Sequence, residues 1–402
     1  MDGIVDLRSR TDRPLRIALL APPMEPVPPR AYGGTERIVA ALEAELTRRG
    51  HKVTTFASGD SEVEGELVPI IKSSLWAQGY RGDVTNQINT GIGICWSQHE
   101  RFDIIHAHTE TMGFLFARHC PTPVVTTLHG RLDVSGIPEL LDEFRDIPLV
   151  AISENQRRWW PENEWRATVH HGLDLQAMPF SGRPGDYLVL VGRMSSEKGI
   201  AEAIEVAERT GLPLKIAAKV HDVVEEKFFA EVLEPHLGND LVEFLGEVQP
   251  MERDPLFAGA RATLMLGSWP EPFGLTAIES LATGTPVISR KTGALPEIVE
   301  HGVDGFLVDD MIEAELAVSL TPRLSRKEIR RRALERFSVQ RMVDEYEVVY
   351  RDLIAERAPQ RSVAARTKLS ATTPAERPAT PVIAPPGQAA EAVLPGLERR
   401  SN

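Results

Sequence analysis

Short apolar runs alternate with helical patterns along the chain, and this alternation restricts the possible folds more than any other feature of the sequence. Residues 15–21 form an apolar run, and residues 33–50 follow it with Ile38, Leu42 and Leu46 at four-residue spacing. Further apolar runs stand at 51–58, 102–108, 123–129 and 149–153. Such alternation is typical of parallel strands joined by helical crossovers. It predicts an open α/β sheet in the first half of the chain.

The same alternation starts again near residue 187. The segment before it, residues 175–187, is short, rich in Pro and Gly and only weakly periodic, as expected of a hinge. The later apolar runs lie at 187–193, 212–219, 242–246, 262–267 and 285–289. We therefore expect two α/β domains, residues 14–178 and 186–340, with a cleft between them. A helix over 341–357 is expected to return to the first domain.

The composition changes sharply after Leu353. Prolines punctuate an Ala, Thr and Ser-rich segment that contains no aromatic residue. Such a segment cannot bury enough apolar surface to offset the entropy lost on ordering. Residues 358–402 are predicted to form a disordered tail.

Charge and hydrophobicity exclude several classes of partner. The chain has 402 residues, a formal net charge of −13 and no apolar run near the roughly 18 residues that span a membrane. The acidic balance disfavours nucleic acid and anionic lipid, so an anionic ligand requires a local cluster of donors. Residues 323–336 are basic, and they indicate either a peripheral lipid contact or an ordinary solvated helix. We expect no nucleic-acid partner and no integral membrane association.

Cysteine usage and the N-terminus bear on location. Cys95 and Cys120 are the two cysteines, and their spacing matches neither a zinc site nor a set of disulfides. Residues 1–16 lack the continuous apolar segment of a signal peptide. These features predict a cytoplasmic protein.

A candidate site lies where the apolar run 262–267 ends. In open α/β sheets ligands bind at such points, because helix N-termini there present unpaired N–H groups and partial positive charge. The loop 268–274 leads into a predicted helix that starts near Leu275. Gly274 allows close approach of the backbone to a ligand. The amides expected to bind an anion belong to Phe273, Gly274, Leu275 and Thr276.

Two acids flank this helix start. Glu271 lies in the loop and Glu279 lies eight positions later in the predicted helix. A carboxylate accepts hydroxyl protons, as from ribose, whereas two acids repel a phosphate placed against them. The pair predicts a ligand with hydroxyls at both ends and an anion in the middle. The alternative is that Glu271 is a solvated loop acid and Glu279 a helix-surface charge.

Two further segments resemble anion sites. Residues 192–199 end a predicted strand and place Arg193 and Lys198 beside a helix start, which suits a diphosphate. Gly33 and Gly34 precede a helix after the first strand. The alternative for Arg193 and Lys198 is that they are ordinary surface side chains, and the alternative for Gly33 and Gly34 is an ordinary Gly-Gly turn.

Taken together, these motifs resemble those of retaining glycosyltransferase family 4. The resemblance rests on Glu271-x7-Glu279, on residues 192–199, on the opening at 32–39 and on residues 284–308, and it extends over roughly 15–355. It implies the GT-B architecture, in which two Rossmann-like α/β/α domains face each other across a cleft. The segment 20–61 is similar to bacterial members labelled as pterin glucosyltransferases.

The resemblance assigns roles to the residues around the donor. It implies that Arg193 and Lys198 hold the donor diphosphate, that Glu279 takes the ribose and that Glu271 contacts the sugar hydroxyls. The amides of 273–275 contact sugar and phosphate.

It also assigns residues outside that motif. Gly33 and Gly34 close on the donor from the other domain, and the backbone of Val248 meets the nucleobase. His129, which ends a predicted strand, is expected to meet the donor sugar near the reacting carbon, the alternative being a capped loop histidine. His106 and His108 either approach the acceptor or are buried and hydrogen-bonded.

The implied activity is that of a retaining hexosyltransferase. It moves a hexose from a nucleotide-diphosphate sugar, with UDP-glucose the first expectation and GDP-mannose the second, to a hydroxyl of a glycan, lipid or small metabolite. A GT-B phosphorylase or sugar-nucleotide epimerase is one alternative. A catalytically silent nucleotide-sugar-binding protein is another. The sequence does not indicate the acceptor or the linkage.

No metal is expected in this mechanism. No DxD motif ends a predicted strand in a form that would chelate a nucleotide-bound cation, and Asp309 and Asp310 lie beyond a turn unrelated to the cleft. Arg193, Lys198 and a helix dipole are expected to stabilise the diphosphate instead. The donor sugar is a co-substrate, and no other cofactor is predicted.

Overall fold

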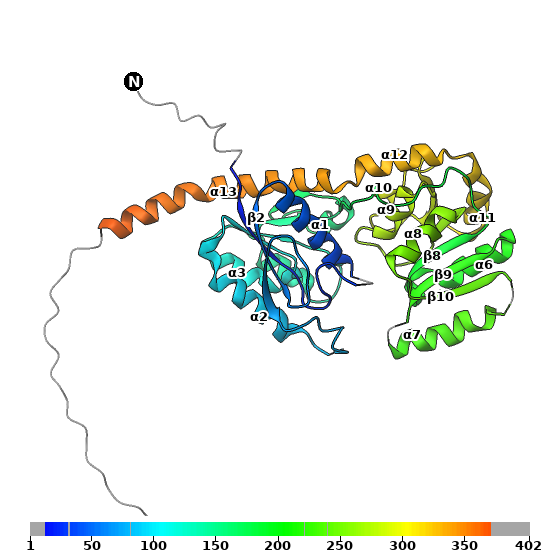
Figure 1. The fold of residues 1–402 in the computed structure, drawn as a ribbon, viewed down its shortest axis with the longest axis horizontal. Helices are drawn as coiled ribbons and strands as arrows, with labels where there is room; N and C mark the ends of the chain where they lie inside the picture. The colour runs from blue at the N-terminus through cyan, green and yellow to red at the C-terminus, as the bar shows by residue number, and fades with distance from the viewer. Residues whose placement is uncertain (1–12, 31–32, 81, 221, 239, 371–402) are drawn as a thin grey trace, which may run out of the picture. The chain divides into compact units, whose positions relative to one another are not determined.

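Two parallel β-sheets with helices on their faces form the protein (Figure 1). The computed structural model describes residues 13–30, 33–80, 82–220, 222–238 and 240–370. The first sheet contains β1 (Arg16–Leu20), β2 (Lys52–Ser58), β3 (Glu66–Ile71), β4 (Ile104–Ala107), β5 (Val124–Thr127), β6 (Leu149–Ala151) and β7 (Trp165–Thr168). The second contains β8 (Leu188–Arg193), β9 (Leu214–Lys219), β10 (Val242–Gly246), β11 (Ala262–Met265), β12 (Val287–Arg290) and β13 (Gly305–Val308).

The helices follow the strands in both halves. Those of the first half are α1 (Gly34–Arg48), α2 (Thr85–Ser97), α3 (Phe114–His119), α4 (Ile137–Glu143) and α5 (Glu154–Arg157). Those of the second are α6 (Ile200–Thr210), α7 (Val223–Phe228), α8 (Pro250–Gly259), α9 (Leu275–Ala282), α10 (Leu295–Ile298), α11 (Met311–Leu320) and α12 (Arg326–Arg336). A last helix, α13, spans Val339–Ser370.

Both sheets have a doubly wound strand order. The order is β3-β2-β1-β4-β5-β6-β7 in the first sheet and β10-β9-β8-β11-β12-β13 in the second, and the pairings are parallel. In such a sheet the carboxyl ends of the strands share one edge, and ligands bind where the order reverses. The predicted fold of two Rossmann-like halves is therefore confirmed.

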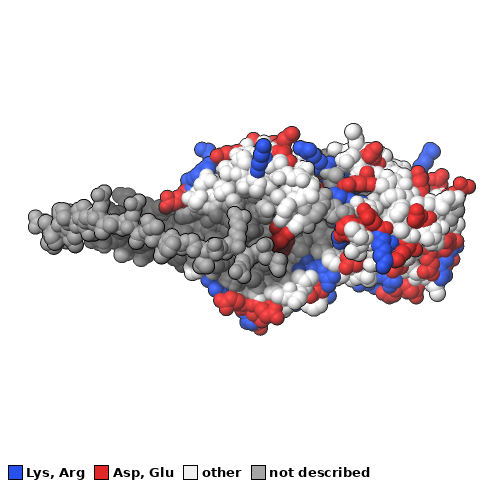
Figure 2. All heavy atoms as spheres, turned by 90° about the horizontal axis from the view of Figure 1, so that it is seen from below, with Lys and Arg blue, Asp and Glu red and all other residues white. Residues whose placement is uncertain are grey.

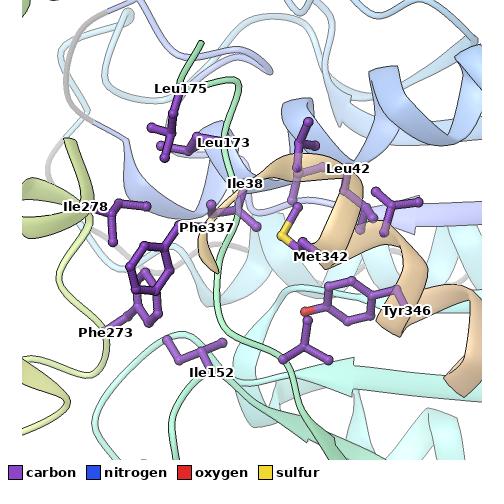
Figure 3. Close-up of a cluster of buried hydrophobic side chains, with 14 of the residues drawn as sticks. Ile38, Leu42, Ile152, Leu173, Leu175, Phe273, Ile278, Phe337, Met342 and Tyr346 are labelled. Atoms are coloured by element: carbon purple, nitrogen blue, oxygen red, sulfur yellow. The ribbon is translucent and has the colours of Figure 1, made fainter. Parts of the chain in front are cut away.

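The two halves share one buried apolar core. Figure 3 shows Phe273 and Ile278 of the second half close to Phe337 and to Ile152 of the first. These side chains belong to one cluster of buried residues that also contains Leu173. Burial of apolar surface stabilises this contact by about 25 cal/mol per Å².

Two segments of the chain that connect the halves lie side by side. The N–H of Leu173 donates to the carbonyl of Phe337 at 3.1 Å, and the N–H of Val339 donates to the carbonyl of Leu173 at 3.2 Å. A Cβ at Gly172 would stand 2.3 Å from the carbonyl oxygen of Ser338, so only glycine fits there. The close pairing thus lies just before the 175–187 segment in which a hinge is predicted.

The start of α13 packs on the first sheet. Tyr346 and Tyr350 are fully buried there, and their hydroxyls lie 2.9 Å from Thr127 Oγ1 and 2.7 Å from His106 Nδ1. Residues to Arg357 belong to one compact unit. The helix itself continues to Ser370, within the segment predicted to be disordered, where residues 360–370 contain no proline and several good helix formers. The rest of the predicted tail, residues 371–402, lies outside the described residues.

The basic helix α12 directs arginines into the protein. Arg330 donates to the carbonyl oxygens of Met178 and Ala282, and Arg336 donates to Asp304 Oδ2 at 3.0 Å. These two side chains therefore fit neither of the expectations for residues 323–336, which were a lipid contact and an ordinary solvated helix. Figure 2 shows acidic and basic side chains interspersed over the visible face. Among the described helices, none combines the length and apolar character needed to cross a bilayer.

Candidate active site

The twelve residues predicted for catalysis and donor binding line one cavity of about 540 Å³. Four of them lie at or after the carboxyl ends of four different strands: Gly33 comes after β1, His129 after β5, Arg193 ends β8 and Val248 comes after β10. The others are Gly34, Lys198, Glu271, Phe273, Gly274, Leu275, Thr276 and Glu279. The fold thus brings together residues from both halves of the chain, as expected for a site at the strand ends.

The N-terminus of α9 opens into this cavity. Gly274, the residue before the helix, has φ 114°, a conformation that side chains rarely adopt. The Phe273 side chain is buried and meets the ring of His171 at a centroid distance of 4.9 Å. Phe273 therefore contributes its backbone, rather than its ring, to the cavity.

The helix α1 approaches from the first half. A Cβ at Gly34 would stand 3.7 Å from the side chain of Leu275 in α9, so the N-termini of α1 and α9 lie close together. Both present unpaired N–H groups, and both favour negative charge. An anion between them would be stabilised from two sides.

Glu271 is held by its backbone and by a cation. Its carbonyl accepts a hydrogen bond from the Ala294 N–H at 2.8 Å, and its side chain accepts one from Lys198. A Cβ at Gly293, where φ is 59°, would stand 2.4 Å from the backbone of Glu271. Gly293 is therefore needed for this loop position, a requirement that sequence reasoning missed although a glycine after a strand was the available signal.

Arg193 is less tightly engaged than Lys198. Its guanidinium nitrogens lie 3.5 Å from Glu225 and 3.9 Å from Glu197, distances beyond a strong hydrogen bond. Lys219, at the end of β9, also lines the cavity and lies 3.5 Å from Glu247. The cavity therefore offers cations to a diphosphate near the end of β8.

Glu279 is buried between two arginines. Its carboxylate is 2% exposed, and its Oε1 lies 2.5 Å from Arg37 and 2.7 Å from Arg253. Arg37 comes from α1 in the first half and Arg253 from α8 in the second. Sequence reasoning missed both arginines. The two arginines thus bring both halves of the chain to one carboxylate.

His129 is half-buried in the cavity wall and lies against two buried histidines, His108 and His171. His129 Nε2 and His108 Nδ1 are 2.9 Å apart, so one ring donates and the other accepts. The ring of His171 stacks on His129 at a centroid distance of 5.2 Å. His106 lies deeper, with both ring nitrogens bonded, to Thr127 and Tyr350. His106 is therefore a buried, hydrogen-bonded histidine.

Glu110 fixes the loop that carries His129. Its Oε1 accepts hydrogen bonds from the N–H groups of His129 and Gly130 at 3.0 and 3.1 Å. Its own backbone has φ 52°, a strained conformation for a residue with a side chain. Sequence reasoning missed Glu110. An acid soon after the end of β4 was the only signal.

Burial shifts the pKa of six groups around these loops. Burial lowers the pKa of four histidines: His106, His108, His129, whose value falls to about 3, and His171. It raises the pKa of Glu36 and of Glu110 to about 7. Burial disfavours the charged form in every case.

These shifts predict that the protein loses stability as the pH falls from about 6.5 to about 4.5. In this range the four histidines take up protons on unfolding and the two glutamates release them, so unfolding takes up about two protons net. Lowering the pH therefore stabilises the unfolded state relative to the folded state. Urea unfolding at pH 6.5 and pH 5.0 measures the effect. An equal free energy of unfolding at both values would contradict it.

No metal-binding group is found in the described part of the chain: nowhere do three or more His, Cys, Asp or Glu side chains gather in a way that could hold an ion. Arg193 and Lys198, which are predicted to contact the diphosphate, both line the cavity.

Known proteins share both the sequence pattern and the fold. A Glycosyltransferase Family 4 model matches residues 32–174, and a model of glycosyl transferases group 1 matches residues 181–338. D-inositol 3-phosphate glycosyltransferase of Mycolicibacterium smegmatis is 26% identical over 377 residues, which cover 80% of this chain and 86% of that protein.

Solved structures agree on the fold. AviGT4, a glycosyltransferase involved in avilamycin A biosynthesis, superposes with a TM-score of 0.65 at 22% identity, over 85% of this chain and 99% of that one. HepE of Anabaena, solved with UDP and glucose, superposes with a TM-score of 0.65 at 19% identity, over 83% and 99%. Two matching family models, in order along the chain, agree with two Rossmann-like halves. The chain therefore belongs to the GT-B glycosyltransferases of family 4.

Proposed function

We propose that this glycosyltransferase is a retaining, metal-independent hexosyltransferase that takes its sugar from a nucleotide diphosphate. The observation that carries the proposal is the convergence of two acids, two cations and the start of α9 on one cavity. UDP-glucose is the first candidate donor and GDP-mannose the second. The acceptor supplies a hydroxyl, and the reaction takes place in the cytoplasm.

The donor is proposed to lie along the second half of the chain. Its ribose binds Glu279, its diphosphate lies between Arg193, Lys198 and the start of α9, and its sugar hydroxyls bind Glu271. Lys198 donates a hydrogen bond to Glu271. A donor would give each of them a new partner, the phosphate for the ammonium and a hydroxyl for the carboxylate.

The proposed reaction is a single substitution with retained configuration. The bond from the anomeric carbon to the diphosphate oxygen breaks, the bond to the acceptor oxygen forms, and the acceptor proton passes to the leaving diphosphate. Arg193 and Lys198 offset the negative charge that develops on this diphosphate. The anomeric proton signal of the product in an NMR spectrum reports the configuration, and an inverted linkage would refute this course.

The relatives support this choice of donor chemistry. The Anabaena protein is described in complex with UDP and glucose and also with UDP-glucose. The mycobacterial relatives are named as glycosyltransferases of D-inositol 3-phosphate or as glycogen synthase. These names differ in acceptor, so they do not indicate one acceptor for this chain.

Replacing Glu279 is expected to remove stabilisation by the donor nucleotide. A ligand at 100 times its dissociation constant raises the free energy of unfolding by roughly 2.7 kcal/mol. Thermal-shift measurements with UDP, GDP, ADP and TDP and their hexose conjugates, on the parent and on Glu279→Ala, test this. We expect one nucleotide series to stabilise the parent and not the variant.

The matched control is Glu205→Ala, which removes an exposed acid of α6 that pairs with Arg209 outside the cavity. It should retain the shift of the parent. Equal stabilisation of Glu279→Ala and the parent would remove Glu279 from the ribose site.

A further inference from the structure

A second cavity, of about 300 Å³, lies next to the first. The two share Gly130, Arg131 and Pro272 in their walls. Two of them, Gly130 and Pro272, are next in the chain to His129 and Glu271, which line the first cavity where the donor sugar is proposed to bind. A molecule in the second cavity would thus have one end beside the point of sugar transfer.

Cations predominate in this second cavity. Arg131, Arg158 and Lys291 line it, together with one acid, Asp133. Such a local excess of positive charge contrasts with the net charge of −13 of the whole chain. This local positive charge would attract an anion into the cavity.

The three cations differ in their ion-pair partners. Arg131 pairs with Asp133 at 2.6 Å, and Lys291 pairs with Asp309 at 2.5 Å. The Arg158 guanidinium lies 5.6 Å from the Trp159 ring centroid, and its side chain makes no ion pair or hydrogen bond with any residue that the structure describes. A guanidinium presents five N–H donors in a planar fork that matches phosphate or carboxylate. Arg158 is thus available to an anionic ligand.

An aromatic ring stands in the same cavity. Trp159 lines it and is 48% exposed, which is unusual for the largest side chain. Trp269, under the guanidinium of Arg131 at 4.5 Å, lies on the side of the first cavity. Aromatic walls with a few polar or charged groups are typical of small-molecule sites.

We propose that the second cavity binds the anionic group, phosphate or carboxylate, of the acceptor. Arg158 and Lys291 hold this group, Trp159 covers the apolar face of the molecule, and the reacting hydroxyl extends past Gly130 toward Glu271. The proposal rests on the proposed transferase function, which it deepens by naming the class of acceptor. A neutral acceptor would leave the charge of Arg158 unused.

The test is a titration of the full chain with inorganic phosphate, followed by ³¹P NMR or calorimetry at constant ionic strength. The donor site is first saturated with the nucleotide that stabilises the protein, so that Arg193 and Lys198 are occupied. We expect one saturable phosphate site in the parent. The double variant Arg158→Gln/Lys291→Gln should bind phosphate at least about tenfold more weakly, because hydrogen bonds to charged groups contribute about 1.5–3 kcal/mol.

Arg145→Gln is the matched control, because Arg145 is a half-exposed arginine of the first half that pairs with Asp142 and Glu162 and lines neither cavity. It should bind phosphate like the parent. Absence of a saturable site, or equal affinity in the parent and the double variant, would overturn the proposal.

Two further titrations show which anion binds and whether its binding depends on the donor site. Acetate in place of phosphate shows which anion the cavity prefers, and binding of either one supports the proposal. The same titrations on the double variant Arg193→Gln/Lys198→Gln without nucleotide test the second cavity independently of the donor, because the cations of the proposed diphosphate site are then absent. If no nucleotide binds the parent but Arg158→Gln/Lys291→Gln still loses phosphate, the donor assignment fails and the anion site stands. If a nucleotide binds the parent but Arg158→Gln/Lys291→Gln binds phosphate as tightly as the parent, the donor assignment stands and the anion site fails.

Discussion

Replacing Arg193 or Lys198 by alanine is expected to lower turnover by roughly 10²–10³-fold. Loss of one preorganised donor to a developing negative charge typically has an effect of this size. Both side chains line the cavity near the end of β8, where the leaving diphosphate is proposed to lie. Initial rates with saturating donor, on each variant and on the parent, measure the effect.

The two variants should differ in one respect. Lys198 bonds Glu271, so Lys198→Ala leaves that carboxylate without its cation and should also raise the KM for the donor. Arg193 is less engaged, and Arg193→Ala should act mainly on turnover. Lys227→Ala is the control, because Lys227 lies on α7, pairs with Glu231 and does not line the cavity. Near-normal turnover of Arg193→Ala would remove it from the diphosphate site.

Replacing Arg326 by methionine is expected to destabilise the protein by roughly 3 kcal/mol or more. Arg326 is 5% exposed and donates to the carbonyl oxygens of Ser181, Ala258 and Ala260 at 2.7–2.9 Å. It also donates to the hydroxyl of Thr285. Methionine fills a similar volume but leaves these acceptors buried and unpaired, and each such group costs about 1–3 kcal/mol. Urea unfolding at pH 7 measures the change.

Two other variants define the cause of that loss. Lysine at position 326 keeps the charge but provides fewer directed donors, so its stability should lie between those of the parent and Arg326→Met. Burial lowers the pKa of Arg326 to about 10, which leaves the side chain charged at neutral pH. Lys327→Met changes the exposed neighbour and should alter stability by less than about 0.5 kcal/mol. Equal losses at 326 and 327 would rule out the buried hydrogen bonds as the cause.

Most strands of the fold could be predicted because central parallel strands are buried on both faces and read as apolar runs. The strands β3 and β7 were not predicted, because they are not buried in this way. Both lie at an edge of the first sheet, and β3 contains Pro69 and buries only Ile70. Edge strands have a neighbour on one side alone, so their sequences need not be apolar.

The donor cavity could be located from sequence because its residues follow strand ends and carry a recognisable spacing. The partners of those residues could not. Arg37 meets Glu279 across 242 positions of the chain, and nothing near either residue indicates the other. The same holds for Arg253, which reaches Glu279 from a different helix. A single sequence shows which residues are charged, and only the fold shows which acid meets which base.

The pairing of Leu173 with Phe337 and Val339 has a mechanical consequence. The chain passes between the halves twice, and both passages are tied together at one point by backbone hydrogen bonds. A joint of this kind permits rotation about that point but resists sliding and separation. Successive rounds of opening and closing would therefore return the two walls of the cleft to the same alignment. Donor and acceptor would then meet in a reproducible geometry each time the predicted hinge closes.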